Sequence, residues 1–315
     1  MSSVSQSEIA TAARLLRAGR LVAFPTETVY GLGANALDPE AVARIYAVKG
    51  RPATSPLIVH VASIEMVHSL VAVWPDIADR LARRFWPGPL TLVIEKLPAI
   101  PLIVTAGLPT VGLRMPAHPV ALALIRAAGV PLAAPSANRF TELSPTTAGH
   151  VRRGLGSDVD LVLDGGPCQV GIESTVLSLA GPKPVLLRPG GISRTELEAL
   201  VGPVAGPEEV KDGAHPAPGM HPRHYSPRTP LLLVNDGKLP DRGKGIYLQH
   251  KHPPSREDIK TIQMPAAAPA YAAALYDELH EADAAGHDWI ALDNPPETPD
   301  WEAVQDRLHR AAANE

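Results

Sequence analysis

The stretch from Gly19 to His60 constrains the fold most, because it places polar, glycine and basic residues between two short apolar runs. The first run, Leu21–Phe24, predicts a short buried strand that Pro25 ends. The hydroxyl, tyrosine and glycine residues of Thr26–Gly33 then predict a binding loop in which the backbone turns tightly. We therefore take this stretch as part of the candidate site.

Two basic residues follow at the predicted end of a helix. The helix is predicted to begin at Pro39, a favourable first-turn residue, and to end at Gly50. Lys49 and Arg51 lie on either side of that glycine, just before a strand predicted over Leu57–Val61. Rigid neighbours on both sides are therefore expected to keep the two cations in place.

Strand and helix patterns alternate along the chain, which predicts an α/β layer architecture. In a large domain, residues 1–206, helices are expected at Ser5–Ala18, Ile64–Val73, Ile77–Phe85, Val120–Ala128 and Ser193–Leu200, and strands at Leu90–Ile94, Val111–Arg114, Val130–Ala134, Leu161–Leu163, Val176–Leu179 and Val185–Arg188. Residues 207–230 are rich in proline and glycine and predict a linker. In a small α/β domain, residues 231–315, strands are expected at Leu231–Val234, Gly245–Gln249 and Trp289–Leu292, and helices at Ala267–Ala285 and Pro299–Ala312.

Composition excludes several classes of protein. Apolar residues make up 45% of the 315 residues, yet no apolar run approaches the roughly 20 residues that span a bilayer, so no membrane segment is expected. The first residues lack the apolar core of a secretory signal, which predicts a cytoplasmic location. Cys168 is the only cysteine, which excludes an intrachain disulfide. No histidine pair comes with a matching carboxylate, so no metal site held by the protein is expected.

Five cations are expected at the ends of elements, on the side where the polar loops gather. They are Lys49, Arg51, Arg114, Arg139 and Arg188. A lysine combined with forked arginine side chains suits a ligand that carries both phosphate and carboxylate groups. For any single arginine a solvated surface position is the better alternative, but five together favour a site for a polyanion.

Hydroxyl and amide groups gather near the ends of predicted strands. Ser136 and Asn138 follow the strand over Val130–Ala134, and ligands commonly bind at the carboxyl ends of strands in open α/β sheets. No histidine is placed for a catalytic triad, so Ser136 and Ser174 are interpreted as hydrogen-bonding positions, with a helix cap or a turn residue as the alternative. For His60, a site residue and a core histidine both stay open.

Several motifs, in one order, carry a resemblance to a known family. They are FPTETVYGLG at Phe24–Gly33, K-x-R at Lys49 and Arg51, PLIVH at Pro56–His60, PSAN at Pro135–Asn138, DGG at Asp164–Gly166, ESTV at Glu173–Val176 and LRPGG at Leu187–Gly191. Through these motifs, residues 20–191 resemble the YrdC-like family. The segment His224–Pro227 and the small domain behind it resemble the two-domain threonylcarbamoyl-AMP synthases of that family.

The resemblance implies a fold and a reaction. The fold would be α/β, with a twisted, open, mixed sheet around a deep concave cavity and a small Rossmann-like C-terminal domain. The reaction, that of a nucleotidyltransferase, would join L-threonine, bicarbonate and ATP, with Mg²⁺ accompanying ATP, to give L-threonylcarbamoyladenylate and pyrophosphate. Partner proteins would then transfer the threonylcarbamoyl group to an adenosine in tRNA, and a weak contact of this chain with tRNA is left open.

The resemblance also implies roles for single residues. Those that match the family's active-site set are Lys49, Arg51, Ser136 and Asn138. Those that match positions around threonine are Thr28, His60, Arg114, Ala134 and Ser174. Those that match positions around ATP are Arg51, Ser55, Thr110, Ser136, Ser144, Arg188 and Tyr225. Ser55 departs from the family, which usually has asparagine there, so its contact with ATP is left open. The linker with Tyr225 is the expected lid.

Two other functions could use such a cavity. A carbamoyl-transfer domain of hydrogenase maturation shares the cavity, but this chain lacks the acylphosphatase-like and zinc-finger segments that would accompany it. An RNA-binding module could also use a basic cavity. The net charge of −4 and the aromatic content of 4% argue against that function.

Overall fold

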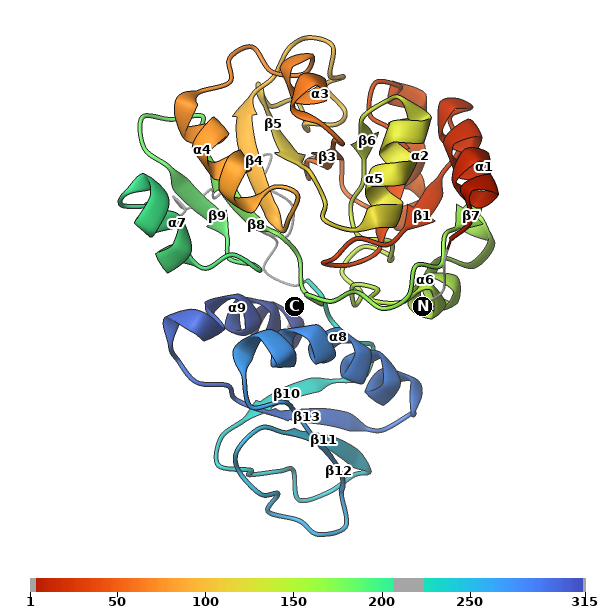
Figure 1. The fold of residues 1–315 in the computed structure, drawn as a ribbon. Coiled ribbons are helices and arrows are strands. Elements are labelled where there is room, and N and C mark those ends of the chain that lie inside the picture. The colour runs from red at the N-terminus through yellow and green to blue at the C-terminus, as the bar shows by residue number, and fades with distance from the viewer. Residues whose placement is uncertain (1–3, 207–223, 314–315) are drawn as a thin grey trace.

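The computed structural model of the chain describes residues 4–206 and 224–313. Over these residues the chain forms two sheets, one of nine strands and one of four. Figure 1 shows the large sheet in the upper part of the molecule and the small sheet in the lower part, with α8 (Ala268–Ala284) and α9 (Glu302–Ala312) between them. This arrangement confirms the predicted fold class. Of the expected linker and lid, residues 207–230, only residues 224–230 belong to the described part of the chain; residues 207–223 lie outside it.

The large sheet is mixed, as the resemblance implies. In the order in which they lie side by side, its strands are β7 (Leu161–Val162), β1 (Val22–Phe24), β2 (Gly31–Asn35), β6 (Leu132–Ala133), β3 (Ile58–His60), β5 (Thr110–Arg114), β4 (Leu90–Glu95), β8 (Thr175–Ser178) and β9 (Val185–Arg188). Strands β3 and β5 are parallel, whereas β5 and β4 are antiparallel. In the β3–β5 pair His60 lies opposite Arg114, so two predicted site residues start from neighbouring strand ends.

Helices cover the large sheet, and local signals set their ends. They are α1 (Gln6–Arg17), α2 (Pro39–Lys49), α3 (Ile64–His68), α4 (Asp76–Phe85), α5 (Pro119–Ala128), α6 (Ala148–Leu155) and α7 (Arg194–Val201), with a 3-10 turn η1 (Gly156–Asp158). The Asp38 side chain caps α2 by accepting hydrogen bonds from two backbone N–H groups. Gly50 ends α2 with a φ of 63°, which glycine adopts without strain. The predicted position of Lys49 and Arg51 at a helix end is therefore confirmed.

The loop predicted over Thr26–Gly33 is shorter in the structure. Its last residues belong to β2, which pairs with β1 in antiparallel register. A Cβ atom on Gly33 would lie only 2.7 Å from Cε1 of Phe24, so this glycine lets the two strands close over the phenylalanine ring. Gly31 and Gly33 thus serve sheet packing, and the prediction that they mark a tight turn was wrong.

The helix predicted over Ile64–Val73 ends earlier, at His68. Val71, which the prediction placed in the helix, instead forms a β-bridge with Lys96 just beyond β4. A β-branched residue suits that extended pairing better than a helix turn. The prediction of this helix end was therefore wrong.

The small domain has a parallel sheet with both of its long helices on one face. Its strands, in spatial order, are β10 (Leu231–Val234), β13 (Trp289–Asp293), β11 (Gly245–Gln249) and β12 (Lys260–Gln263), and a 3-10 turn η2 (Pro299–Trp301) precedes α9. Strand β12 was not predicted. It lies at the sheet edge with mostly exposed side chains, so it lacks the apolar run that signals a buried strand.

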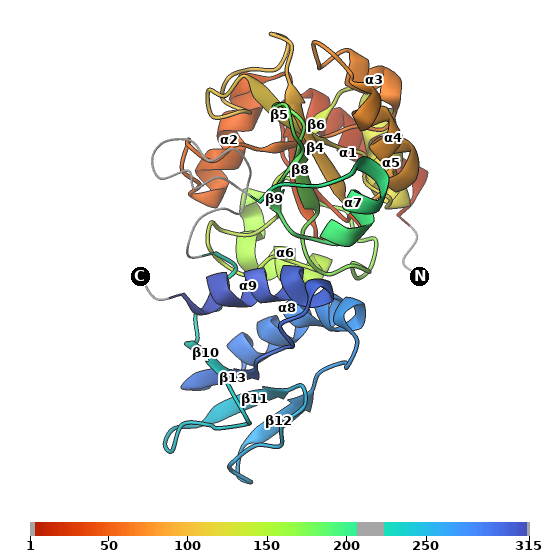
Figure 2. The ribbon, with the colours of Figure 1, turned by 90° about the vertical axis from the view of Figure 1, so that its left-hand side faces the viewer.

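Residues of both domains share one hydrophobic core. Val29, Leu143 and Ile172 of the large domain belong to the same buried cluster as Tyr225 and Leu275. Figure 2 shows α8 and α9 running beneath the large domain, close to α6. The loops of the large domain that face this core therefore rest on the small domain. Among the described helices, none is long and apolar enough to cross a membrane.

Candidate active site

A hollow with about 530 Å³ of empty space lies where strand ends of the large sheet meet. The residues predicted for the site that line it are Thr28, Arg51, His60, Arg114, Ala134, Ser136, Ser174, Arg188 and Tyr225. The fold brings these side chains together from loops and strand ends that are far apart in the sequence. Their individual contacts with ligands stay predictions.

Five other residues that the resemblance implies do not line this hollow. They are Lys49, Ser55, Thr110, Asn138 and Ser144. Thr110 lines a second, smaller hollow of about 270 Å³, and Ile58 borders both hollows. The hydroxyl of Ser144 donates a hydrogen bond to Glu173 at 2.5 Å. The buried hydroxyl of Ser55 has no hydrogen-bond partner among the described residues, while its carbonyl oxygen accepts from Arg51.

Lys49 lies behind the cavity wall. Its ammonium group donates hydrogen bonds to the carbonyl oxygens of Ser136 at 2.6 Å and of Asn138 at 2.5 Å. Burial, together with the nearby Arg51, lowers the pKa of Lys49 well below its usual value. In this geometry Lys49 supports the wall segment that presents Ser136 to the cavity.

Arg51 brings a buried guanidinium to the cavity. Its Nε donates to the carbonyl oxygen of Ser55 at 3.2 Å, and its Nη2 donates to that of Pro56 at 3.0 Å. Its Cζ lies 5.8 Å from the ring centroid of Phe140. Burial lowers the pKa of Arg51 to about 10, so the group stays charged near neutral pH.

Arg188 and Ser174 form a joined pair at another part of the wall. The Nη2 of Arg188 donates to the carbonyl oxygen of Ser174 at 2.9 Å and to its hydroxyl at 3.2 Å. The Ser174 hydroxyl also lies 2.8 Å from that of Thr91. These bonds hold both side chains in fixed positions at the cavity.

Arg139 does not belong with the other cations. It does not line the cavity; it contacts the Val48 carbonyl oxygen and pairs with Asp158 at 2.5 Å. Its side chain is 40% exposed. Its place in the predicted polyanion site was therefore wrong, because a local acidic partner and solvent account for its charge.

The direction of one hydrogen bond decides what Thr28 offers to a ligand. Thr26 Oγ1 lies 2.6 Å from the carbonyl oxygen of Val29, which can only accept, so the single hydroxyl proton of Thr26 points there. In the 2.8 Å contact between the two hydroxyls, Thr28 must then be the donor. Thr28 therefore presents lone pairs to the cavity and can accept a hydrogen bond.

His60 is uncharged at the cavity wall. Burial, and secondly the charge of Arg114, lower its pKa to about 3. Its Nδ1 has no hydrogen-bond partner among the described residues. A buried, neutral imidazole with an unsatisfied nitrogen is suited to hydrogen-bond a ligand in the cavity.

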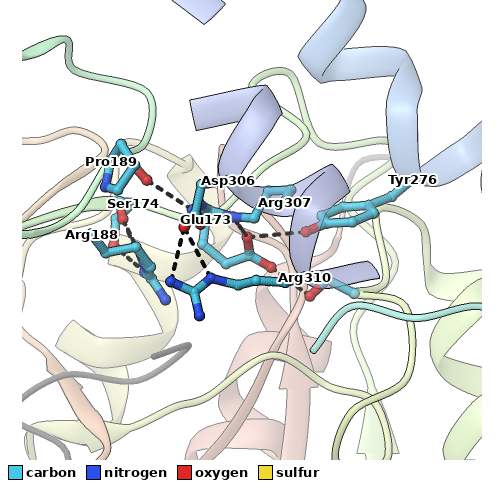
Figure 3. A network of polar contacts seen from close by, with 9 residues as sticks. Glu173, Ser174, Arg188, Pro189, Tyr276, Asp306, Arg307 and Arg310 are labelled. Atoms are coloured by element: carbon cyan, nitrogen blue, oxygen red, sulfur yellow. Dashed lines mark hydrogen bonds and ion pairs between the residues drawn. The ribbon is translucent and has the colours of Figure 1, made fainter. Parts of the chain in front are cut away.

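An interdomain network, which the sequence did not reveal, supports one wall. Glu173 lines the cavity, and its Oε2 accepts hydrogen bonds from Arg307 Nε at 2.7 Å and from Tyr276 Oη at 3.2 Å. Figure 3 shows these side chains converging on Glu173, with Arg188 close by. Burial opposes ionisation of Glu173, but Arg307 and Arg188 outweigh it and lower its pKa.

Arg307 comes from α9 of the small domain and is fully buried. Its Nη2 donates to the Pro189 carbonyl oxygen at 3.0 Å, and its Cζ lies 5.4 Å from the ring centroid of Tyr225. It shares the apolar face of α9 with Val304, Leu308 and Ala311. An arginine within an apolar helical stripe was the sequence signal that could have found it.

Fold and site together define a class of protein. It is a two-domain α/β protein whose cavity holds three buried arginines, several hydroxyl groups and a neutral histidine. Such a lining suits a ligand or ligands with both phosphate and carboxylate groups.

The comparisons with known proteins identify the family. A family model described as "Telomere recombination" matches residues 14–190, and one described as "Threonylcarbamoyl-AMP synthase, C-terminal domain" matches residues 192–313. The chain belongs to the two-domain threonylcarbamoyl-AMP synthase family, as the resemblance predicts.

Individual relatives agree with this assignment. The threonylcarbamoyl-AMP synthase of Bacillus subtilis is 43% identical over 98% of this chain and 94% of its own length. That of Schizosaccharomyces pombe is 37% identical over 99% of this chain and 90% of its own length. The crystal structure of Pyrococcus abyssi Sua5 complexed with L-threonine superposes with a TM-score of 0.90 at 38% identity, covering 99% of this chain and 96% of that one.

Proposed function

We propose that this chain joins L-threonine, bicarbonate and ATP to form L-threonylcarbamoyladenylate and pyrophosphate. The observation that carries the proposal is the gathering of Thr28, His60 and Arg114 beside Arg51 and Arg188 in one cavity. One set suits an amino acid and the other suits phosphates. The name shared by the relatives and the threonine bound to the Pyrococcus abyssi structure support the same reaction.

The threonine end of the cavity would be built from fixed polar groups. The guanidinium of Arg114 would bind the α-carboxylate, because a charged fork matches that group. Thr28 would accept a hydrogen bond from the amine, since its own proton is committed to Thr26. The neutral His60 and the hydroxyl of Ser174 would complete this end.

The ATP end would be the more cationic. Arg51 and Arg188 would offset the charge of the phosphates, and Ser136 would hydrogen-bond them. Tyr225, from the last part of the predicted linker, lines the cavity and lies edgewise against His224, with 4.0 Å between the ring centroids. Lys49 would act through Ser136 and Asn138, whose carbonyl oxygens it holds.

The chemistry requires positioning more than a strong base. The amine of threonine would form a bond to the carbon of bicarbonate with loss of water, which gives a carbamate. A carbamate oxygen would then attack the α-phosphorus of ATP, while the bond from that phosphorus to the bridging oxygen of pyrophosphate breaks. Fixed cations and hydrogen-bond donors would stabilise the charge that moves onto the leaving pyrophosphate.

Mg²⁺ would enter the site on ATP. The described residues contain no group of three or more His, Cys, Asp or Glu side chains that could hold a metal ion. Glu173 at the cavity wall and Glu27 behind Arg114 are each paired with an arginine. Phosphate oxygens and water are ligands that Mg²⁺ accepts readily, and the bound ion would neutralise phosphate charge.

The product would serve tRNA modification. Its mixed anhydride is reactive toward water, so we expect partner proteins to receive it and to transfer the threonylcarbamoyl group to an adenosine in tRNA. A weak contact of this chain with tRNA and a cytoplasmic location belong to the same proposal.

Pyrophosphate release provides the test. We expect release that requires both L-threonine and bicarbonate, and a lower rate when L-serine replaces L-threonine, because serine lacks the methyl group. Release from ATP alone, or release that does not depend on the amino acid, would refute the synthase proposal.

A further inference from the structure

We propose that Glu27 is a positioning residue that holds Arg114 ready for the carboxylate of the amino-acid substrate. The inference rests on the proposed function, in which Arg114 binds that carboxylate. Glu27 is not among the residues that line the cavity, so it would act through Arg114 and not on the substrate.

The two side chains form a buried ion pair. Oε1 of Glu27 lies 2.8 Å from Nη2 of Arg114, and their side chains are 9% and 5% exposed. Neither oxygen of the Glu27 carboxylate makes a hydrogen bond with a described residue, and Arg114 is its one ion-pair partner among them. Arg114 is thus the one polar partner that the described chain gives to this carboxylate.

The pair leaves one side of the guanidinium for a ligand. Nε of Arg114 donates to the carbonyl oxygen of Gly88 at 3.3 Å, and Nη2 faces Glu27. Over the described residues, Nη1 makes no hydrogen bond within the chain. Two of the three nitrogens are therefore held by the protein, and the third remains for an anion in the cavity that Arg114 lines.

The backbone on both sides keeps the pair in register. Glu27 lies in the turn that Thr26 closes by accepting from the N–H groups of Thr28 and Val29, and its own carbonyl oxygen accepts from Val170 at 2.7 Å. Arg114 ends β5, where its carbonyl oxygen accepts from Val61 at 2.9 Å. The carboxylate and the guanidinium thus meet between two fixed segments.

Stability alone is a poor reason for such a pair. Removing two charges from water costs several kcal/mol per ion. The attraction within a buried pair offsets this desolvation cost only when further hydrogen bonds satisfy both groups. The Glu27 carboxylate lacks those further bonds among the described residues. A function that needs an oriented arginine explains the pair better than packing does.

The pair also makes the Arg114 end of the cavity less positively charged than the Arg51 end. Glu27 offsets the charge of Arg114, whereas Arg51 has no acidic partner among the described residues. A single carboxylate then suits the Arg114 end, and the more highly charged phosphates favour the Arg51 end. Removing the charge of Glu27 should let pyrophosphate compete with threonine for Arg114.

The experiment compares Glu27→Gln with a matched control, Glu95→Gln, on the exposed end of β4. Steady-state pyrophosphate release gives KM for L-threonine and for ATP, and calorimetry gives the dissociation constant of L-threonine alone. For Glu27→Gln we expect the dissociation constant and the KM of L-threonine to rise about ten- to hundredfold, as when a residue that supports a ligand-binding group is removed. The KM for ATP should stay nearly unchanged. Inorganic pyrophosphate should inhibit this variant competitively against threonine. The control should behave as the wild type.

A double-mutant cycle shows whether Glu27 acts through Arg114. In the background of Arg114→Gln, Glu27→Gln should add little further loss of threonine affinity. A full additional loss, or wild-type threonine affinity in the single variant, would overturn the inference. If Glu27→Gln does not fold, Glu27→Asp, which keeps the charge but withdraws it by one methylene, must weaken threonine binding, and unchanged binding would overturn the inference. Failure of the wild type itself to bind threonine would instead refute the proposed function.

Discussion

Thr26 sets the hydrogen-bond polarity of Thr28 at the cavity with one hydroxyl group. Its oxygen accepts from the backbone N–H groups of Thr28 and Val29 at 3.2 Å, and its proton goes to the carbonyl oxygen of Val29. The hydroxyl of Thr28 consequently donates inward, to Thr26, and accepts from the cavity side. Thr26 is therefore expected to affect threonine binding through Thr28, without a contact of its own with the ligand.

The variant Thr26→Val tests this effect. Valine keeps the shape of threonine but cannot accept the proton of Thr28, so the Thr28 hydroxyl can turn its proton into the cavity and lose its acceptor role. We expect KM for L-threonine to rise about tenfold and KM for ATP to change less than about twofold, as for the loss of one buried hydrogen bond. Steady-state kinetics of pyrophosphate release measure both constants.

Thr261→Val provides the control, because Thr261 lies exposed on the edge strand β12. It should leave both constants unchanged. Equal increases of KM for threonine and for ATP in Thr26→Val would contradict the polarity argument and would indicate a general distortion of the cavity.

Residue types were more predictable than residue pairs. Lys49, Arg51 and Arg188 stood out because cations beside strand ends and glycines suit an anion site. The partners of Arg114 and Glu173 did not stand out, since each lies far away in the sequence, at Glu27 and Arg307. A glutamate in a polar loop resembles a solvated residue until the fold shows that it is buried.

At the scale of elements, α6 and α8 meet across the domain interface through a histidine stack. The ring centroids of His150 and His280 are 3.9 Å apart. Burial, with the nearby Arg153, lowers the pKa of His150 to about 4, and burial, with the nearby His150, lowers that of His280 to about 4. Asp277 lies 3.3 Å from His150, but its side chain is 53% exposed, so solvent screens its attraction.

These pKa values predict the pH dependence of stability. An unfolded histidine has a pKa near 6.5, so between about pH 6.5 and pH 4 the unfolded chain binds protons that the folded chain does not. The contribution is complete above about pH 6.5 and is lost as the pH falls toward 4. We expect the free energy of unfolding to fall by on the order of 1 kcal/mol per pH unit in this window.

Urea unfolding at a series of pH values measures this slope. His280→Gln should reduce the slope, whereas His309→Gln, at an exposed position of α9, should not. An unchanged slope in His280→Gln would show that the stack is not the acid-sensitive element.

Helix α9 links the small domain to the cavity wall through Arg307. The variant Arg307→Met keeps an unbranched side chain but leaves the buried carboxylate of Glu173 without its closest cation. We expect a loss of about 3–5 kcal/mol in the free energy of unfolding, measured by urea titration, together with reduced pyrophosphate release.

The double variant Glu173→Gln with Arg307→Met removes both charges and tests the cause. It should recover part of the lost stability, because no uncompensated charge then remains buried. If Arg307→Met lowers the free energy of unfolding by less than about 1 kcal/mol, the ion pair contributes little to the stability of the domain interface.

At the scale of the whole molecule, the fold class and most elements were predictable because their signals are local. The helix α2 has a capping aspartate, a first-turn proline and a final glycine, and the structure places its ends at these residues. Strands β2 and β12 gave no such signal, since one is rich in glycine and the other is an exposed edge. Their strand pairing comes from tertiary contacts, which a local pattern does not contain.

The relation between the domains was also hidden from local patterns. The sequence suggests two separate domains joined by a linker, whereas Val29 and Ile172 of the large domain belong to the same core as α8 and α9. The small domain thereby contributes to the support of the cavity, through that core and through Arg307. Site residues such as Tyr225 and Glu173 depend on contacts from both sides.

The most direct test follows the carbon of bicarbonate into the product. The chain is incubated with ATP, L-threonine and bicarbonate labelled with heavy carbon, and the products are identified by mass spectrometry. We expect L-threonylcarbamoyladenylate that carries one labelled carbon, formed together with pyrophosphate. An adenylate of threonine without the label, or ATP cleavage without any threonine-containing adenylate, would contradict it.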